Sequence, residues 1–176
     1  MAEPLIDLRG FILAQVESGT RSVKLAMDGL TGEQLYYMPT ADTNSIAWLA
    51  WHLSRYRDAI TSAICDESQV WVTEGWAPRF GMEPDRDGIG DTPEQVAAFR
   101  PDPGTLSGYI DAVHTAGMKR IGRLTDEQLN RVGVYVFPNE RPAWRALASM
   151  IGDSGQHNGQ INYVRGMVSG FGWRNA

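Results

Sequence analysis

Two histidines and an aspartate stand at positions where helices usually place apolar residues. Asp153 and His157 are four residues apart, so on a helix their side chains lie on one face. His52 falls on a similar face of an earlier helical segment, at alternating spacings of four and three. Burying such groups costs several kcal/mol unless each finds a partner or a metal ion. The set His, Asp and His suits zinc, nickel or ferrous iron, and it leaves coordination positions open for a reactant.

A hydrogen-bonded polar core is the alternative explanation for these residues. A single inward histidine is more often a core residue than a ligand, and Asp153 and His157 could form a simple pair within one helix. The chain has only 3 histidines, so the placement of two of them on inward faces is informative. The third, His114, lies beside the inward Val113 and is predicted at the surface. Spacing alone leaves both explanations open.

Four long helices are needed to position these residues. Apolar residues at helical spacing predict them from about Pro4 to Met27, Ser45 to Cys65, Pro103 to Leu124 and Pro142 to Val168. The predicted inward faces carry Leu5, Leu8, Ile12, Val16, Val23 and Met27 on the first helix; Ser45, Leu49, His52, Tyr56, Ala59 and Ala63 on the second; Leu106, Tyr109, Ile110, Val113, Gly117 and Ile121 on the third; and Ala146, Met150, Asp153, His157, Gln160, Val164 and Met167 on the fourth. The sequence thus predicts an all-α fold, a four-helix bundle that forms a single domain over residues 1–176.

The segments between the long helices also have recognisable patterns. Residues 66–101 are rich in Gly, Pro and Asp and predict a long loop between helices 2 and 3, with a short helix that begins at Thr92-Pro93. Residues Val132–Phe137 alternate and predict a small strand or extended segment.

One short motif occurs twice. Leu30-Thr-Gly-Glu-Gln-Leu35 returns as Leu124-Thr-Asp-Glu-Gln-Leu129, each time after a long helix. Capping boxes of this kind are common, so the two copies could be independent. We favour a repeat of two helical hairpins, which would make the helix of His52 face the helix of Asp153 and His157. Helix bundles build metal sites from facing helices in this way.

The overall composition excludes several classes of protein. The formal net charge is −5 and the pI is near 5.2, and no Lys/Arg run appears, so we expect no nucleic-acid partner. No apolar stretch approaches the ~18 residues of a membrane span, and no secretion signal is visible, so we expect a cytoplasmic protein without a membrane partner. Cys65, the only cysteine, excludes an internal disulfide and is interpreted as a packing residue.

The long loop carries four residues that could contact a substrate: Trp71, Trp76, Arg79 and Phe80. Loops longer than about 12–15 residues are often lids or binding segments. Aromatic rings beside an arginine could stack on a sugar or enclose an apolar electrophile. A hydrophobic cluster packed under the loop is the alternative.

Several motifs together resemble the DinB-like superfamily. They are Asn-Ser-Ile-Ala-Trp-Leu-x-Trp-His ending at His52, Trp-x-x-Arg-Phe-Gly from Trp76, Asp-Thr-Pro-Glu-Gln-Val from Asp91, and Asp-x-x-x-His-x-Gly-Gln-x-x-Tyr-x-Arg-Gly from Asp153. The resemblance runs from about Leu8 to Gly166. Within the superfamily, the chain is most similar to the actinobacterial mycothiol S-transferase branch.

This resemblance implies a bundle with a divalent metal ion, zinc in the first place and nickel or iron otherwise, on His52, Asp153 and His157. Many relatives carry histidine where this chain has Asp153, which makes the identity of the metal less certain. The branch further implies conjugation of a low-molecular-weight thiol, mycothiol, to electrophiles for detoxification. A DNA-repair role does not follow from the family name.

The resemblance also implies how the reaction proceeds. Coordination to a divalent cation deprotonates a thiol, whose free pKa is near ~8.5, so no protein side chain beyond the ligands is needed for catalysis. The residues expected to contact substrate are Arg55, Tyr56, Trp76, Arg79 and Gln160, and the residues expected to orient ligands or substrate are Gln156, Asn158 and Gln160. The expected partners are a small thiol and an electrophile, and a homodimer is compatible with the sequence. The alternatives are a hydrolase that uses metal-bound water and a non-catalytic, stress-related binding protein.

Overall fold

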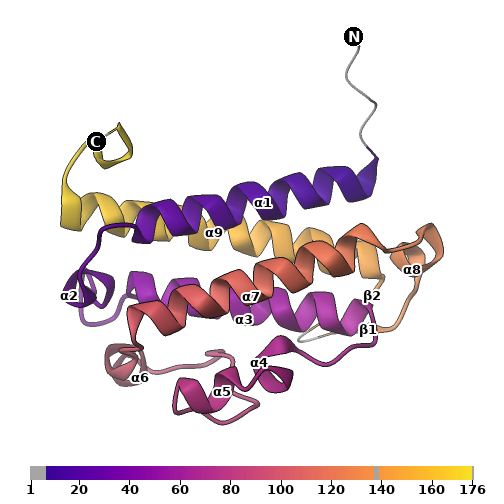
Figure 1. The fold of residues 1–176 in the computed structure, drawn as a ribbon, viewed down its shortest axis with the longest axis horizontal. Coiled ribbons are helices and arrows are strands. Elements are labelled where there is room, and N and C mark those ends of the chain that lie inside the picture. The colour runs from indigo at the N-terminus through magenta and orange to yellow at the C-terminus, as the bar shows by residue number, and fades with distance from the viewer. Residues whose placement is uncertain (1–6, 137–138, 176) are drawn as a thin grey trace.

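The four predicted long helices form a bundle. The computed structural model describes residues 7–136 and 139–175. The long helices are α1 (Leu8–Met27), α3 (Ile46–Ile64), α7 (Pro103–Gly122) and α9 (Ala143–Ser169). Helices α7 and α9 each pack against both α1 and α3, so α1 and α3 occupy opposite corners of the bundle (Figure 1). The prediction of an all-α, four-helix bundle is confirmed.

Shorter elements join the long helices. They are α2 (Gly32–Leu35), α4 (Val70–Thr73), α5 (Trp76–Arg79), α6 (Pro93–Ala98), α8 (Asp126–Asn130), the strands β1 (Val134–Val136) and β2 (Asn139–Arg141), and a 3₁₀ turn at Trp173–Asn175. The two strands pair antiparallel, with Val134 opposite Arg141. The predicted segment Val132–Phe137 therefore contains a strand, although Phe137 lies outside the described residues. None of the described helices is both long and apolar enough to cross a membrane.

Side-chain caps determine where three of the long helices begin. Asp7, Ser45 and Asp102 each accept a hydrogen bond from the backbone N–H three residues later, at the starts of α1, α3 and α7. Helix α1 therefore begins at Leu8, later than the predicted start near Pro4, which lies outside the described residues. Pro142 directly precedes α9, as predicted.

Both copies of the repeated motif form complete capping boxes. Thr31 and Gln34 bond reciprocally at the start of α2, and Thr125 and Gln128 do the same at the start of α8. The long helices that follow the two copies, α3 and α9, pack directly against each other. This is the facing arrangement that the repeat predicts.

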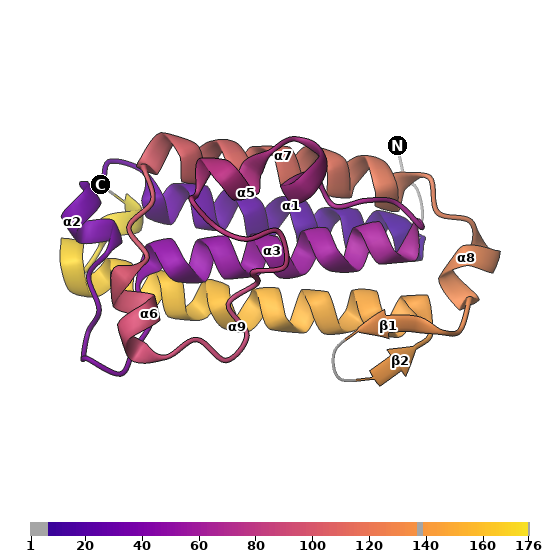
Figure 2. The same cartoon turned by 90° about the horizontal axis from the view of Figure 1, so that it is seen from below.

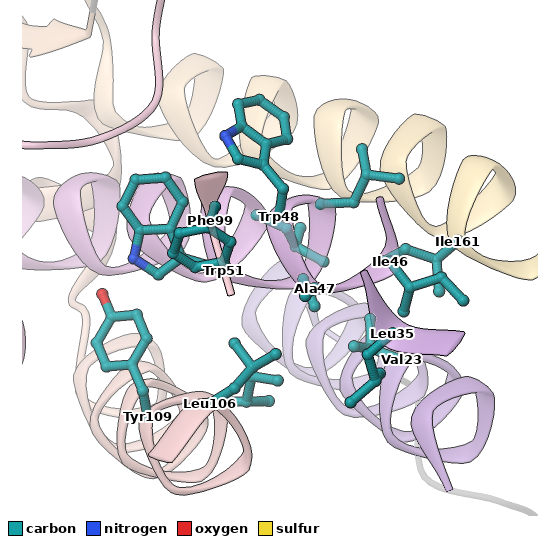
Figure 3. Packing of buried hydrophobic residues seen from close by; sticks show 14 of the residues in the cluster. Val23, Leu35, Ile46, Ala47, Trp48, Trp51, Phe99, Leu106, Tyr109 and Ile161 are labelled. Atoms are coloured by element: carbon teal, nitrogen blue, oxygen red, sulfur yellow. The ribbon is translucent and has the colours of Figure 1, made fainter. Parts of the chain in front are cut away.

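The connection between α3 and α7 is more ordered than predicted. It contains three short helices, α4 to α6, which lie on the side of the bundle formed by α3 and α7 (Figure 1 and Figure 2). Trp71 is fully buried, and the rings of Trp71, Trp76 and Phe80 all lie within 6 Å of the Tyr109 ring on α7. Figure 3 shows Trp51, Phe99 and Tyr109 gathered in the same layer. The aromatic residues of this connection thus extend the core, as the hydrophobic-cluster alternative proposed.

A buried carboxylate anchors this connection to the bundle. Asp58 on α3 is fully buried and accepts hydrogen bonds from the backbone N–H groups of Val70 and Trp71, at 3.2 and 3.0 Å. Arg120 on α7 donates to Oδ1 of the same carboxylate at 2.9 Å. Arg120 also donates to the carbonyl of Ser68 at 2.7 Å, so one ionic cluster joins α3, α7 and the start of α4.

The predicted inward faces are right for α7 and need correction elsewhere. All six residues predicted to face inward on α7 are buried. On α1, Leu8 is 53% exposed, because it lies in the first turn, beyond the end of the core. On α3, Ser45 and Leu49 of the predicted face are buried, but its other members are only half-buried: His52, Tyr56, Ala59 and Ala63. The neighbouring Leu53 and Arg57 are buried instead. On α9, Met167 is exposed near the C-terminal end.

Candidate functional site

Helices α3 and α9 bring His52, Asp153 and His157 together at the rim of the bundle. The ring centroids of His52 and His157 are 5.3 Å apart and the rings are nearly perpendicular, at 82°. His157 Nε2 lies 3.5 Å from Asp153 Oδ1 within α9. All three side chains are partly exposed rather than sealed in the core. The prediction of an inward position is therefore corrected to a rim position, which a small molecule can reach.

The loop before α6 holds His52 in one tautomer. His52 Nδ1 donates to the backbone carbonyl of Asp87 at 2.6 Å, and a carbonyl can only accept, so Nδ1 carries the proton. His52 Nε2 makes no hydrogen bond with any described residue. The Trp48 indole stacks on the imidazole at 4.7 Å, and burial lowers the pKa of His52. His52 is thus a neutral imidazole with a free Nε2, the form in which histidine binds metal ions.

His157 is oriented in a comparable way by its own helix. Its Nδ1 lies 2.8 Å from Gln160 Oε1, one turn later, so Gln160 accepts the Nδ1 proton and Nε2 is directed at Asp153. The hydrogen bond with Asp153 raises the pKa of His157, against the opposing effect of burial. Both imidazoles therefore have Nδ1 fixed by an oxygen acceptor and Nε2 directed away from that acceptor.

Asp153 has an unsatisfied oxygen. Its Oδ2 is buried and has no hydrogen-bond partner among the described residues. Such an atom is unfavourable unless something compensates it. The 3.5 Å between Asp153 Oδ1 and His157 Nε2 exceeds the roughly 2.7–2.9 Å of a strong charge-assisted hydrogen bond. Two ligand atoms on one tetrahedral ion, with bonds of about 2.1 Å, would lie roughly 3.4 Å apart.

The three side chains have the donor atoms that a divalent cation prefers, but their present arrangement does not form a coordination site. Two neutral imidazole nitrogens and one carboxylate oxygen are common ligands of zinc and other divalent ions. However, no group of three His, Cys, Asp or Glu side chains in the described ranges is arranged to hold a metal ion as it stands. Binding would therefore require a small adjustment of these side chains at the rim.

The approach of the loop to His52 depends on Gly88. This residue has φ of +88°, and a Cβ atom there would lie 2.8 Å from the Trp51 ring and 3.0 Å from His52 Nδ1. Gly88 is therefore required both by its backbone conformation and by the lack of space above α3.

We expect Gly88→Ala to lower the free energy of unfolding by about 1–3 kcal/mol more than Gly90→Ala does. Gly90 is a matched control, because its φ is +79° but a Cβ atom there meets nothing within 4 Å. Chemical denaturation of the two variants measures the difference. Equal decreases in the free energy of unfolding for the two variants would show that the loop does not pack tightly against α3 at Gly88.

The structure places two of the five expected substrate residues near the triad. Gln160 accepts a hydrogen bond from His157. Burial raises the pKa of the Tyr56 phenol, and the negative charge of Asp153 raises it further. Gln160 thus contacts the imidazole pair directly, and Tyr56 lies one turn after His52 on α3. Of the two other orienting residues, Gln156 is exposed and Asn158 donates to the carbonyl of Gly19 on α1, at 3.2 Å.

The other three expected substrate residues pack between α3 and the connection, with Arg55 on α3 and Trp76 and Arg79 in α5. Arg55 is only 3% exposed; its Nε donates to the carbonyl of Arg86 at 2.9 Å and its guanidinium lies over the Trp71 ring. Trp76 is buried near α7, and Arg79 stacks on it at 4.4 Å. Their contacts thus hold α4 and α5 in place, and the structure does not bring them to the triad.

A cavity of about 330 Å³ lies beside Gln160 on the outer side of the site. It is lined by Pro39, Asp42, Thr43, Asn44, Leu49, Gln160, Tyr163 and Val164. Tyr163 is 69% exposed and one turn from Gln160. The cavity was not predicted from the sequence, although Gln160 and Tyr163 belong to the same motif as His157 and lie one turn apart.

His114 and Cys65, the other residues considered in the sequence analysis, lie away from the histidine site. His114 is half-buried rather than at the surface, because its Nε2 pairs with Glu17 of α1 at 3.0 Å. Cys65 ends α3 and is partly buried against the core, in keeping with a packing residue.

Comparisons with known proteins agree with this architecture. Residues 15–161 match the family described as the DinB superfamily. A crystal structure described as the conserved protein of locus from Enterococcus faecalis superposes with a TM-score of 0.83 and 23% sequence identity, covering 94% of this chain and 99% of that chain. At that identity the likeness shows the fold alone. No curated protein matches the sequence.

Proposed function

The chain belongs to the DinB superfamily, and from this we propose that it is a metal-dependent S-transferase that conjugates a low-molecular-weight thiol to electrophilic small molecules. The superfamily includes metal-dependent enzymes. The observation that carries the proposal is the pair of imidazoles, each with Nδ1 held by an oxygen acceptor, next to the buried Oδ2 of Asp153, which has no partner among the described residues. A purely structural polar core would satisfy that oxygen with a donor.

His52, Asp153 and His157 are the residues that would hold the ion, with zinc as the first candidate and nickel or iron as alternatives. When bound, a divalent cation lowers the pKa of a thiol below its free value of about 8.5, so that the sulfur reacts as a thiolate at neutral pH. Asp153 contributes a negative charge that offsets part of the charge of the ion. The Asp87 carbonyl and Gln160 keep the two imidazoles oriented, the role that supporting hydrogen bonds play around metal sites.

Tyr56 is the candidate proton donor beside the reacting groups. Because its pKa is raised, the phenol stays protonated at neutral pH and its hydroxyl can donate a hydrogen bond. An electrophile that gains negative charge as the sulfur attacks would be stabilised by that donor. Trp48 covers one face of His52 and keeps water from that side of the ring.

The cavity beside Gln160 is where we place the thiol cosubstrate. Its wall combines apolar surface from Leu49 and Val164 with hydroxyl, amide and carboxylate groups from Thr43, Asn44 and Asp42. This mixture suits a thiol that carries sugar hydroxyls, such as mycothiol, and the Tyr163 ring can stack on a sugar face. Mycothiol is therefore the thiol that we propose.

We expect conjugation of an electrophilic probe to require both added thiol and the metal ion. Protein treated with a chelator should lose activity and regain it on addition of one equivalent of zinc, with the rate rising as the thiol concentration rises. Metal content by elemental analysis on the same samples checks the stoichiometry. Turnover of ester or amide probes without any thiol would instead establish the hydrolase, and absence of stoichiometric metal would contradict both enzymes.

A further inference from the structure

A second polar site is centred on Arg57, a buried cation without a carboxylate partner. Arg57 extends from α3 to the opposite corner of the bundle, where its Nη1 donates to Thr20 Oγ1 on α1. The residue is 4% exposed, and its Nε is buried without a hydrogen-bond partner. No Asp or Glu among the described residues lies within ion-pair distance of it. By contrast, the buried Arg120 on α7 pairs with the Asp58 carboxylate.

An unpaired buried charge is unfavourable, so the surroundings of Arg57 should show what compensates its charge. Desolvation lowers the pKa of Arg57 to about 10, and no neighbouring charge opposes that effect. At neutral pH the guanidinium is still a cation. Removing such a charge from water normally requires a counter-charge or a set of acceptors. Thr20 supplies one acceptor, and no described residue accepts from Arg57 Nη2.

The guanidinium borders a cavity of about 220 Å³ between α1 and α9. The cavity is lined by Gln15, Val16, Ser18, Gly19, Ser22, Arg57, Met150, Ile151, Ser154, Gly155 and Asn158. A Cβ atom at Gly19 would come within 3.5 Å of Arg57 Nη2 and 3.3 Å of Asn158 Nδ2, so small residues on α1 leave these polar atoms uncovered. Such a volume can hold several waters or a small organic molecule.

The polar groups of the cavity identify the class of ligand. We propose that this cavity is a binding site for a small monocarboxylate, whose carboxylate pairs with Arg57. Among the described residues, Arg57 is the only cation that lines the cavity, so one negative charge is balanced and a dianion would leave an excess. Ser18 and Ser154 supply hydroxyl donors. The buried Asn158 Oδ1, which has no partner among the described residues, can accept from a hydroxyl or amine on the ligand.

The apolar part of the wall favours an organic acid over an inorganic anion. Val16 and Met150 are buried, and with Ile151 they cover one side of the cavity. A short hydrocarbon chain attached to the carboxylate would bury its surface there. We therefore expect propionate, which has one charge and a short chain, to be a suitable probe.

This site is separate from the histidine site, although both use α3 and α9. Ser154 and Asn158 lie on the side of α9 that faces α1, whereas Asp153 and His157 lie on the side that faces His52. The monocarboxylate site therefore does not depend on the proposed metal or on the transferase activity. Its test needs no measurement of activity.

Titration of the full chain with propionate, followed by calorimetry and by the backbone amide signals of Gly19 and Gly155, tests the proposal. We expect saturable binding of propionate and little binding of the neutral isostere propionamide. Arg57→Met keeps the length of the side chain without the charge, and it should weaken propionate binding about tenfold or more. Arg100→Met removes an exposed arginine elsewhere and should leave binding unchanged.

A second pair of variants keeps the test valid if Arg57→Met fails to fold. Gly155 lies in α9 at the cavity, and a Cβ atom there meets nothing within 4 Å. Gly155→Glu should supply an internal carboxylate, raise the melting temperature above that of Gly155→Gln, and abolish propionate binding. Equal binding of propionate and propionamide, propionate binding unaffected by Arg57→Met, or equal melting temperatures for the two Gly155 variants would each overturn the proposal.

Discussion

Replacing His157 with alanine should remove bound metal and reduce thiol conjugation by more than the roughly 10- to 100-fold that loss of a supporting residue causes. The substitution deletes one of the three proposed ligands and leaves Asp153 Oδ1 without its neighbour at 3.5 Å. Metal content and the rate of conjugation, measured on the same preparation, check both effects. Helix content by circular dichroism should stay near that of the wild type, because His157 lies at the rim of the bundle.

Two control variants separate this result from general damage. His114→Ala removes another half-buried histidine with a carboxylate partner, Glu17 at 3.0 Å, and should keep the metal. Cys65→Ser should keep conjugation, since the reacting sulfur belongs to the cosubstrate. Full metal content without His157 would establish Asp153 and His157 as a simple helical pair. Activity lost with Cys65 and kept without His157 would mean that a protein thiol performs the chemistry.

Replacing Asp58 with alanine should lower the free energy of unfolding by about 3–5 kcal/mol. The change leaves the Arg120 guanidinium buried beside the gap, and it also leaves the N–H groups of Val70 and Trp71 without their acceptor. Because those two residues begin α4, the connection between α3 and α7 should loosen as well. Urea denaturation measures the first effect, and the fluorescence of the buried Trp71 reports the second.

A surface ion pair provides the matched comparison. Lys24 and Asp111 bridge α1 and α7 at 2.5 Å, and both side chains are about half exposed. Asp111→Ala should lower the free energy of unfolding by no more than about 1 kcal/mol, since exposed pairs are screened by water. Similar losses for Asp58→Ala and Asp111→Ala would show that the buried cluster does not hold the connection.

The positions of the helices follow from the amino-acid sequence, because the signals for them are local. Capping residues such as Ser45 and Asp102 and the recurrence of apolar residues every three or four positions operate within a single segment. Helical spacing grouped His52, Asp153 and His157 as candidate ligands, the repeated motif predicted the facing positions of α3 and α9, and the resemblance implied the metal ion. The single domain over residues 1–176 and the metal stay predictions.

The depth at which each helix face is buried depends on the packing of distant segments. Helix α3 is covered by α7, α9 and the connection with α4 to α6, so apolar and small residues surround nearly all of it. A helix that is buried on most sides has no single apolar stripe, and its periodicity does not show which side is deepest. The periodicity therefore predicts His52 in the core, whereas the structure places it at the rim.

The buried charges and the support of His52 were also decided by tertiary contacts. Arg57, Asp58 and Arg120 are of types that usually face water, and their burial depends on partners or cavities formed by distant segments. The acceptor for His52 is the backbone carbonyl of Asp87, a group that every residue carries, so no residue type could indicate it. Interactions between distant segments depend on how the chain packs, and local sequence patterns do not predict that packing.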